Sequence, residues 1–229
     1  CKDTSLTKGE SFLDTIRVIG GYCDVIVLRH PEPGSAPKAT TVTTTPIING
    51  GDGSNEHPTQ TFLDLYTIQK TKGQLDNLHI AFFGDLKHGR TVHSLATALQ
   101  SFNVTMYFVS PKTLKMPQKQ LQELKKHVEC IELEDIKEIA PHLDVVYATR
   151  IQKERFNYEA DFQKIKGSYK LDKTFLTKAK KDVKILHPLP RVGEIQHALD
   201  YTPNAVYFQQ AHYGIPIRKA LLSLVLGKI

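Results

Sequence analysis

The sequence predicts an α/β fold built from two doubly wound lobes, each a parallel sheet covered by helices. Apolar runs of strand length alternate with helical patterns along most of the 229 residues, which is typical of parallel sheets with crossover helices. Several of these runs end in polar or charged loops, where such folds place ligand contacts. An apolar helical pattern from Gln210 to Ile229 closes the chain, and we expect it to pack back on the first lobe.

Composition excludes several classes of function. A hydrophobic content of 40% with 24% charged residues is ordinary for a globular protein. The net charge of +6 comes from lysines scattered over helical patterns, so we expect solvated surface and small anionic substrates, and no nucleic acid. No apolar run approaches the length of a membrane span, and the longest, Leu221 to Leu226, is interpreted as a buried helix end. Three cysteines without metal-ligand spacing fit reduced thiols in the cytoplasm.

The first lobe is predicted to begin with a helix and a strand. Apolar residues recur at helical spacing over residues 10–22, and a buried strand over residues 24–28 ends in Arg29. A basic residue at the carboxyl end of a parallel strand is suited to contact an anionic ligand. Residues 31–45 are predicted to form a loop with one helical turn.

The stretch from Pro46 to Ile68 is expected to organise the site. A short apolar run enters a glycine-rich turn, and a helix follows with Pro58 in its first turn. This arrangement presents backbone N–H groups and a positive helix end to an anion. His57 and Gln60 flank the start of the helix. Spacing alone leaves open a plain strand-to-helix loop with a capping histidine.

A hinge is expected over residues 70–77, followed by the second lobe. The predicted strands of this lobe span residues 78–84, 105–109, 128–133, 144–149, 183–187 and 205–208. Its predicted helices span residues 91–101, 117–127, 135–141 and 173–179. We therefore assign residues 1–72 to a first domain, 73–209 to a second domain, and 210–229 to a C-terminal helix that returns to the first.

Two charged loops follow strands of the second lobe. Residues 84–91 have the spacing of a P-loop, but Arg90 stands where that motif needs a lysine, which argues against nucleotide binding. An arginine at a helix start suits a carboxylate, which it can bind with two hydrogen bonds. In the second loop Arg150 and Gln152 alternate, so both can point the same way from an extended strand end. Plain surface charge is the alternative for this second loop.

A third loop, residues 187–191, contains two prolines. Pro188 and Pro190 flank Leu189, which fixes the backbone and removes two N–H donors, so the loop offers carbonyl acceptors. Taken alone, this could equally be a buried structural loop. Together these loops predict a cationic cleft that suits two small polyanionic substrates, held so that a group passes directly from one to the other. We expect neither a metal nor a cofactor.

Four segments resemble aspartate carbamoyltransferase, catalytic chain: residues 51–60, 84–94, 149–155 and 187–191. The resemblance covers essentially the whole chain. It implies transfer of the carbamoyl group of carbamoyl phosphate to L-aspartate, which gives N-carbamoyl-L-aspartate and phosphate in pyrimidine biosynthesis. The related enzymes that act on ornithine have a cysteine in the His-x-Leu-Pro segment, so Pro188 favours aspartate.

The resemblance also implies roles for individual residues. Arg29 and His57 would polarise the carbamoyl oxygen as catalytic residues. The residues that would bind carbamoyl phosphate are Arg29, His57, Gln60, Pro188, Leu189 and Pro190. The residues that would bind aspartate are Arg90, Arg150 and Gln152. Ser5 and Lys8 match a loop that reaches into the neighbouring subunit's site in a homotrimer, and a cis Leu189–Pro190 bond is expected because relatives have one.

One family motif is absent from the sequence. The Ser-Thr-Arg-Thr phosphate-binding sequence has no match, so the first lobe is expected to be an incomplete carbamoyl-phosphate domain, cut from a longer polypeptide. We expect this chain alone not to catalyse the reaction, and to expose the apolar faces of Phe12, Ile16 and Ile26. A non-catalytic family member or fragment with a structural or assembly role is the alternative. Fusion to other pyrimidine enzymes stays open.

Overall fold

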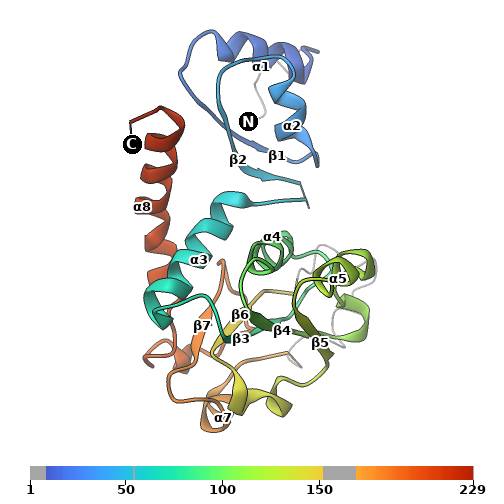
Figure 1. Ribbon diagram of the computed structural model, residues 1–229, viewed down its shortest axis with the longest axis vertical. Helices are drawn as coiled ribbons and strands as arrows, with labels where there is room; N and C mark the ends of the chain where they lie inside the picture. The colour runs from blue at the N-terminus through green and yellow to red at the C-terminus, as the bar shows by residue number, and fades with distance from the viewer. Residues whose placement is uncertain (1–8, 54, 152–168, 229) are drawn as a thin grey trace. The chain divides into compact units, whose positions relative to one another are not determined.

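The computed structural model describes residues 9–53, 55–151 and 169–228. Contacts within the chain divide it into two compact units, which are residues 1–59 with 215–229, and residues 60–214. The predicted α/β class is confirmed: both units contain parallel sheets with helices, which Figure 1 shows as ribbons.

The first unit contains a two-stranded parallel sheet. Strand β1 (Ile26–His30) pairs with β2 (Ile47–Asp52). Helix α1 (Phe12–Gly20) precedes β1 in the chain, and helix α2 (Ser35–Thr40) connects the two strands. Helix α1 begins after Ser11, whose Oγ accepts a hydrogen bond from the N–H of Asp14, as expected for an N-cap.

The small core of this unit contradicts one expectation. Ile16 and Ile26 are buried at 3% and 7% exposure and pack with Ala39, and Phe12 packs against them while only partly buried. Their apolar faces are therefore not left exposed. The short helix α2 supplies Ala39, where we expected only a single helical turn.

Helix α3 (Pro58–Lys72) begins at the predicted proline. Its last turn contains Lys70 and Lys72, where the connection between the lobes was expected to begin. The contacts divide the chain between Thr59 and Gln60, close to the start of this helix. The domain boundaries at residues 72 and 209 therefore remain a proposal.

The second unit is built on a five-stranded sheet in the order β5-β4-β3-β6-β7, in which all pairs are parallel. The strands are β3 (Leu78–Phe83), β4 (Val104–Val109), β5 (Glu129–Leu133), β6 (Val145–Ala148) and β7 (Lys184–Leu186). The helices are α4 (Arg90–Leu99), α5 (Gln118–Leu124) and α7 (Lys173–Lys178). The chain builds outward from β3 on one side and then returns to its other side, so the strand order reverses between β3 and β6. In open α/β sheets, ligands bind at the carboxyl edge of such a switch point.

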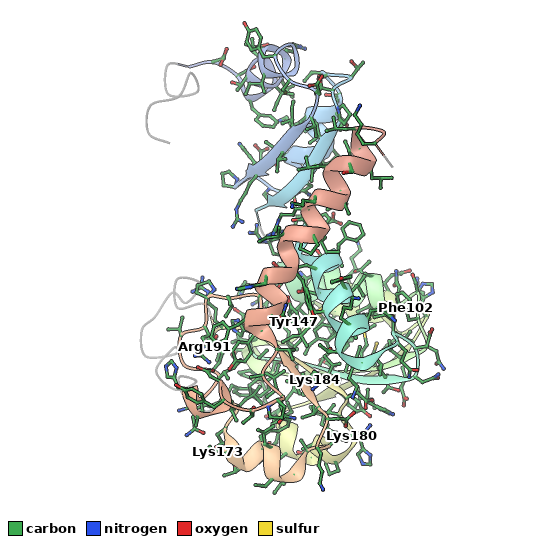
Figure 2. The ribbon with its side chains drawn as sticks, turned by 90° about the vertical axis from the view of Figure 1, so that its left-hand side faces the viewer. Phe102, Tyr147, Lys173, Lys180, Lys184 and Arg191 are labelled. Carbon is green, nitrogen blue, oxygen red and sulfur yellow. The ribbon has the colours of Figure 1, made fainter. Side chains whose placement is uncertain are left out.

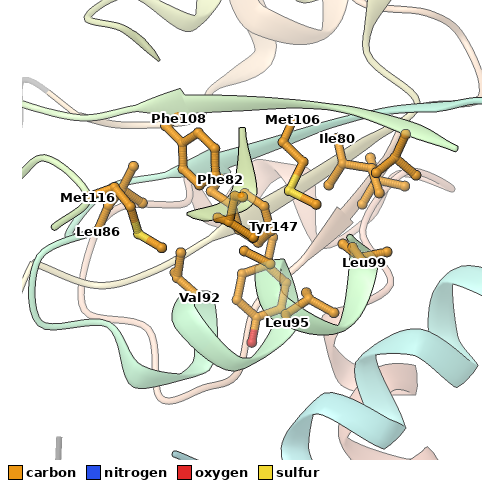
Figure 3. Close-up of a cluster of buried hydrophobic side chains, with 14 of the residues drawn as sticks. Ile80, Phe82, Leu86, Val92, Leu95, Leu99, Met106, Phe108, Met116 and Tyr147 are labelled. Carbon is orange, nitrogen blue, oxygen red and sulfur yellow. The ribbon is translucent and has the colours of Figure 1, made fainter. Parts of the chain in front are cut away.

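Alternation along the strands divides the core into two layers. Phe82 and Tyr147 belong to the layer that also holds Leu95 of α4, and Figure 3 shows these side chains packed between the strands and that helix. Phe83 and Val146 point to the other face and join a second buried cluster. Helices on both faces of a parallel sheet explain why its strands read as continuous apolar runs.

Three predictions about individual elements are wrong. Residues 205–208 form no strand, because only Ala205 bridges to Ile185 and helix α8 (Tyr207–Val225) begins two residues later. Residues 135–141 form two 3₁₀ turns, Ile136–Glu138 and Ala140–His142, because Pro141 cannot donate the N–H that a continuous helix needs.

The third wrong prediction is that the end of α8 is buried. No residue from Leu221 to Leu226 is buried, and Leu224 is 61% exposed. Among the described residues, no helix is long and apolar enough to span a membrane.

Candidate active site

In the first unit, Arg29 and His57 line one cavity. Arg29 is the fourth residue of β1, and its side chain is exposed. The cavity, of about 290 Å³, is also lined by Thr59 and by Arg218 of α8. Its remaining walls are formed by Val27, Ile48, Gly50, Leu221 and Leu222. Two guanidinium groups at one cavity favour an anion over a cation there. Arg218 was not predicted as a site residue, because the pair Arg218-Lys219 resembles an ordinary charged helix surface.

Asp52 organises the turn between β2 and α3. This carboxyl is 1% exposed and accepts hydrogen bonds from the side-chain amides of Asn49 and Asn55 and from the backbone N–H groups of Gly34 and Glu56. Burial opposes ionisation, but these donors together hold the pKa of Asp52 below its ordinary value. The sequence does not distinguish Asp52, since an aspartate in a glycine-rich segment is typical of any turn.

The start of α3 places His57 next to that turn. Gly53 has φ of +54°, and a Cβ there would lie 2.5 Å from the carbonyl oxygen of Pro31, so only glycine fits. His57 is half-buried, and its Nδ1 lies 3.4 Å from the hydroxyl of Thr59. Pro58 opens the helix, so His57 stands at the positive end of the helix dipole.

In the second unit, Gln60 and the proline loop have buried partners. The Nε2 of Gln60 donates to Asp64 at 2.8 Å. In the loop, the Leu189–Pro190 bond is cis, as predicted, and Leu189 has φ of +53°. The N–H of Leu189 donates to Nδ1 of His187 at 2.8 Å, while Nε2 of His187 lies 2.7 Å from Glu194.

Glu194 fixes the histidine of this loop. Burial opposes its ionisation, but the hydrogen bond with His187 and the N–H groups of Val192 and Gly193 hold the pKa of Glu194 below its usual value. Because Nδ1 of His187 accepts from Leu189, its Nε2 carries the proton and donates to Glu194.

Arg90 and Arg150 follow neighbouring strands. Arg90 is the first residue of α4, after β3, and Arg150 comes two residues after β6, which pairs with β3. The two strand ends approach closely at Gly84, where a Cβ would lie 2.3 Å from the carbonyl oxygen of Thr149. Both arginines are half-buried, so two cationic side chains come from the edge where the strand order reverses.

The structure thus places the predicted residues in two sets. Arg29 and His57 share the cavity of the first unit. Gln60 and the proline loop are joined by hydrogen bonds in the second, where Arg90 and Arg150 follow adjacent strands. Gln152, Ser5 and Lys8 lie outside the described residues. Within residues 9–53, 55–151 and 169–228, no group of three or more His, Cys, Asp or Glu residues could hold a metal ion.

Two domain models match this chain. The model described as "Aspartate/ornithine carbamoyltransferase, carbamoyl-P binding domain" matches residues 1–70, and its counterpart, the "Asp/Orn binding domain", matches residues 76–225. The family's N-terminal domain is therefore represented in the first lobe.

Curated relatives and solved structures agree with these matches. The aspartate carbamoyltransferase catalytic subunit of Methanocaldococcus jannaschii is 54% identical over 223 residues, which cover 96% of this chain and 72% of that protein. The corresponding subunit of Thermococcus onnurineus is 52% identical over 225 residues, with 98% and 73% covered.

A structure of the M. jannaschii catalytic subunit superposes with a TM-score of 0.91 at 51% identity and covers 99% of this chain and 74% of that one. The Trypanosoma cruzi aspartate transcarbamoylase, solved with carbamoyl phosphate and aspartate, gives 0.90 at 38% identity, with 96% and 73% covered.

The chain belongs to the aspartate/ornithine carbamoyltransferase family. Within that family it is similar to the catalytic subunits that use aspartate.

Proposed function

We propose that this chain transfers the carbamoyl group of carbamoyl phosphate to the amine of L-aspartate. The observation that carries the proposal is identity of 51–54% to aspartate carbamoyltransferase catalytic subunits over at least 96% of the chain. The site agrees with two anionic substrates. Arg29 and His57 line one cavity, and Arg90 and Arg150 follow the adjacent strands β3 and β6 at one edge of the sheet in the second unit.

The proposed chemistry is one displacement at the carbamoyl carbon. The neutral amine of aspartate attacks this carbon and negative charge develops on the carbamoyl oxygen. The bond from the carbon to the phosphate oxygen then breaks, and the proton lost by the amine passes to the departing phosphate. Arg29 and His57 stabilise the developing charge. Gln60 and the carbonyls of Pro188 and Leu189 accept hydrogen bonds from the carbamoyl NH₂ group, with Pro190 fixing the loop. Arg90, Arg150 and Gln152 bind the aspartate carboxylates, so that proximity supplies much of the rate.

We further infer a homotrimer with shared sites, in which Ser5 and Lys8 of one subunit reach the site of the next. The support is their match to the family's mobile loop. Mixing the impaired Arg150→Ala and Lys8→Ala chains at low aspartate concentration tests this, because shared sites give the mixture more activity than either variant has alone, whereas self-contained sites do not. We also propose a cytoplasmic location, supported by the free cysteines Cys23 and Cys130.

The alternative candidate is a non-catalytic family member or fragment that serves assembly. One experiment separates the two. Residues 1–229 are assayed with carbamoyl phosphate for release of phosphate and for the carbamoylated amine, with aspartate as the acceptor and with ornithine as a control acceptor. They are also titrated with N-(phosphonacetyl)-L-aspartate. Turnover with aspartate but not with ornithine supports the transferase. Neither turnover nor binding by a folded chain supports the second candidate.

A further inference from the structure

A buried carboxyl lies at the centre of the hydrogen bonds that join α3 to the proline loop. Asp64 is fully buried, one helical turn after Gln60. Its Oδ1 accepts from Nε2 of Gln60 at 2.8 Å and from Nε2 of Gln210 at 2.6 Å. Its Oδ2 accepts from the hydroxyl of Tyr147 at 2.8 Å. Figure 3 shows the Tyr147 ring within the apolar cluster, so this polar centre is bounded by close-packed hydrocarbon.

The two oxygens of Asp64 decide how both glutamine amides are turned. They accept hydrogen bonds from both amides and from Tyr147, so each amide presents its NH₂ group to Asp64 and turns its carbonyl oxygen away. For Gln210, that oxygen accepts the backbone N–H of His187 at 2.8 Å. For Gln60, the same rule leaves the amide oxygen as the atom directed away from Asp64, able to accept a hydrogen bond from a donor.

The second branch of the network reaches the proline loop. Gln210 is 1% exposed and His187 is also 1% exposed, so their bond is shielded from water. His187 in turn accepts the N–H of Leu189, which fixes the carbonyl groups on either side of that bond. One carboxylate therefore controls the amide of Gln60 and, through Gln210, the loop that contains Leu189.

We propose that Asp64 is a positioning residue that makes the site selective for the carbamoyl NH₂ group. It holds the Gln60 amide oxygen and the carbonyls of the proline loop as a matched set of acceptors for the two N–H donors of that group. This inference rests on the proposed function, which gives both elements the same substrate group.

Two ligands separate this role from a general structural one. Carbamoyl phosphate carries the NH₂ group, whereas N-(phosphonacetyl)-L-aspartate has a single amide nitrogen, bonded to aspartate, and no NH₂. We would measure Kd for both ligands by calorimetry on the full chain and on its Asp64→Asn variant. The asparagine side chain keeps the shape of aspartate but can no longer accept from all three donors. The variant's Kd for carbamoyl phosphate should rise about 10- to 100-fold, while its Kd for the analogue should change less than about 3-fold.

Asp144→Asn is the matched control. Asp144 is also buried and accepts from the N–H of His79 and from Lys180, but it precedes β6, whereas Tyr147 lies near the end of that strand. In Figure 2, Lys180 lies at the outer end of the second unit and Tyr147 inside it. This variant should lower Tm and leave both Kd values unchanged.

Each outcome decides the question. Selective loss of carbamoyl phosphate in Asp64→Asn, with normal binding in Asp144→Asn, supports the inference. Equal loss of both ligands, no loss of either, or a wild-type chain that binds only the analogue overturns it while the proposed function can still stand. A folded wild-type chain that binds neither ligand and has no turnover overturns the proposed function, and the inference with it.

Discussion

The Nε2 of Gln210 lies 2.6 Å from Oδ1 of Asp64, although 146 residues separate the two in the chain. This bond ties the first turn of α8 to the second turn of α3 inside the second unit. The sequence pattern around neither residue predicts this contact. Asp64 is a buried ionisable group, and the effect of its ionisation on stability can be measured.

The first prediction concerns stability against pH. Burial raises the pKa of Asp64 to about 7, despite its three hydrogen-bond donors. Between about pH 4 and 7 the folded state keeps a proton that the unfolded state has released. The free energy of unfolding should therefore fall as pH rises through this window, by at most about 4 kcal/mol, and level off above it. Urea unfolding at several pH values measures the slope, which should be shallower in Asp64→Asn. An equal slope in both proteins would refute the assignment.

The second prediction concerns Arg150. Because it follows β6 beside the loop that leads to Arg90, we expect it to bind aspartate and not carbamoyl phosphate. Arg150→Ala should raise the KM for aspartate by about 10-fold or more, the factor for loss of one charge-assisted contact, and leave the Kd for carbamoyl phosphate nearly unchanged. Arg150→Lys should recover only part of the affinity, because lysine lacks the planar fork. Equal losses for both substrates would contradict the assignment.

The third prediction concerns His57. Its place before the first turn of α3 favours a hydrogen-bond donor to a developing oxyanion and disfavours a general base that must become cationic beside a positive helix end. His57→Ala should lower kcat by about 10²–10³. Added imidazole and related amines provide the check. If they restore activity in proportion to their basicity, His57 is a base after all.

The fourth prediction compares two glycines. Gly84 and Gly73 both have positive φ, +117° and +80°, but only Gly84 faces a neighbour, since a Cβ there would lie 2.3 Å from the carbonyl oxygen of Thr149. Gly73→Ala should cost about 1–2 kcal/mol from backbone strain alone. Gly84→Ala should cost clearly more, because the backbone that follows β6 must also shift. Chemical denaturation measures both, and equal losses would show that the close approach has no energetic effect.

The sequence predicted most of the fold because buried parallel strands are apolar along their whole length. The five strands of the second unit lie within a residue or two of their expected bounds. The strand predicted at residues 205–208 was wrong because this run is as apolar as the true strands. In the structure it makes only one isolated bridge, at Ala205, and forms no strand.

The candidate site was predicted unevenly for a physical reason. Arg90 and Arg150 could be placed because strand ends meet at one edge of a sheet. Asp64 could not, since an aspartate in a helix usually faces water. Arg218 could not, since it is exposed like an ordinary surface arginine. Their positions depend on partners far away in the chain, and periodicity carries no information about those partners.

The order of strands around β3 has a consequence for synthesis on the ribosome. Strands β3, β4 and β5 leave the ribosome in sequence and can pair on one side as they emerge. The other side of β3 stays open until residues 145–148 have been translated. Through that interval the nascent chain presents the unpaired edge of an apolar strand, the feature most prone to join the wrong chain. Sheet assembly is then completed from the middle outward, with β6 closing that edge before β7 is added.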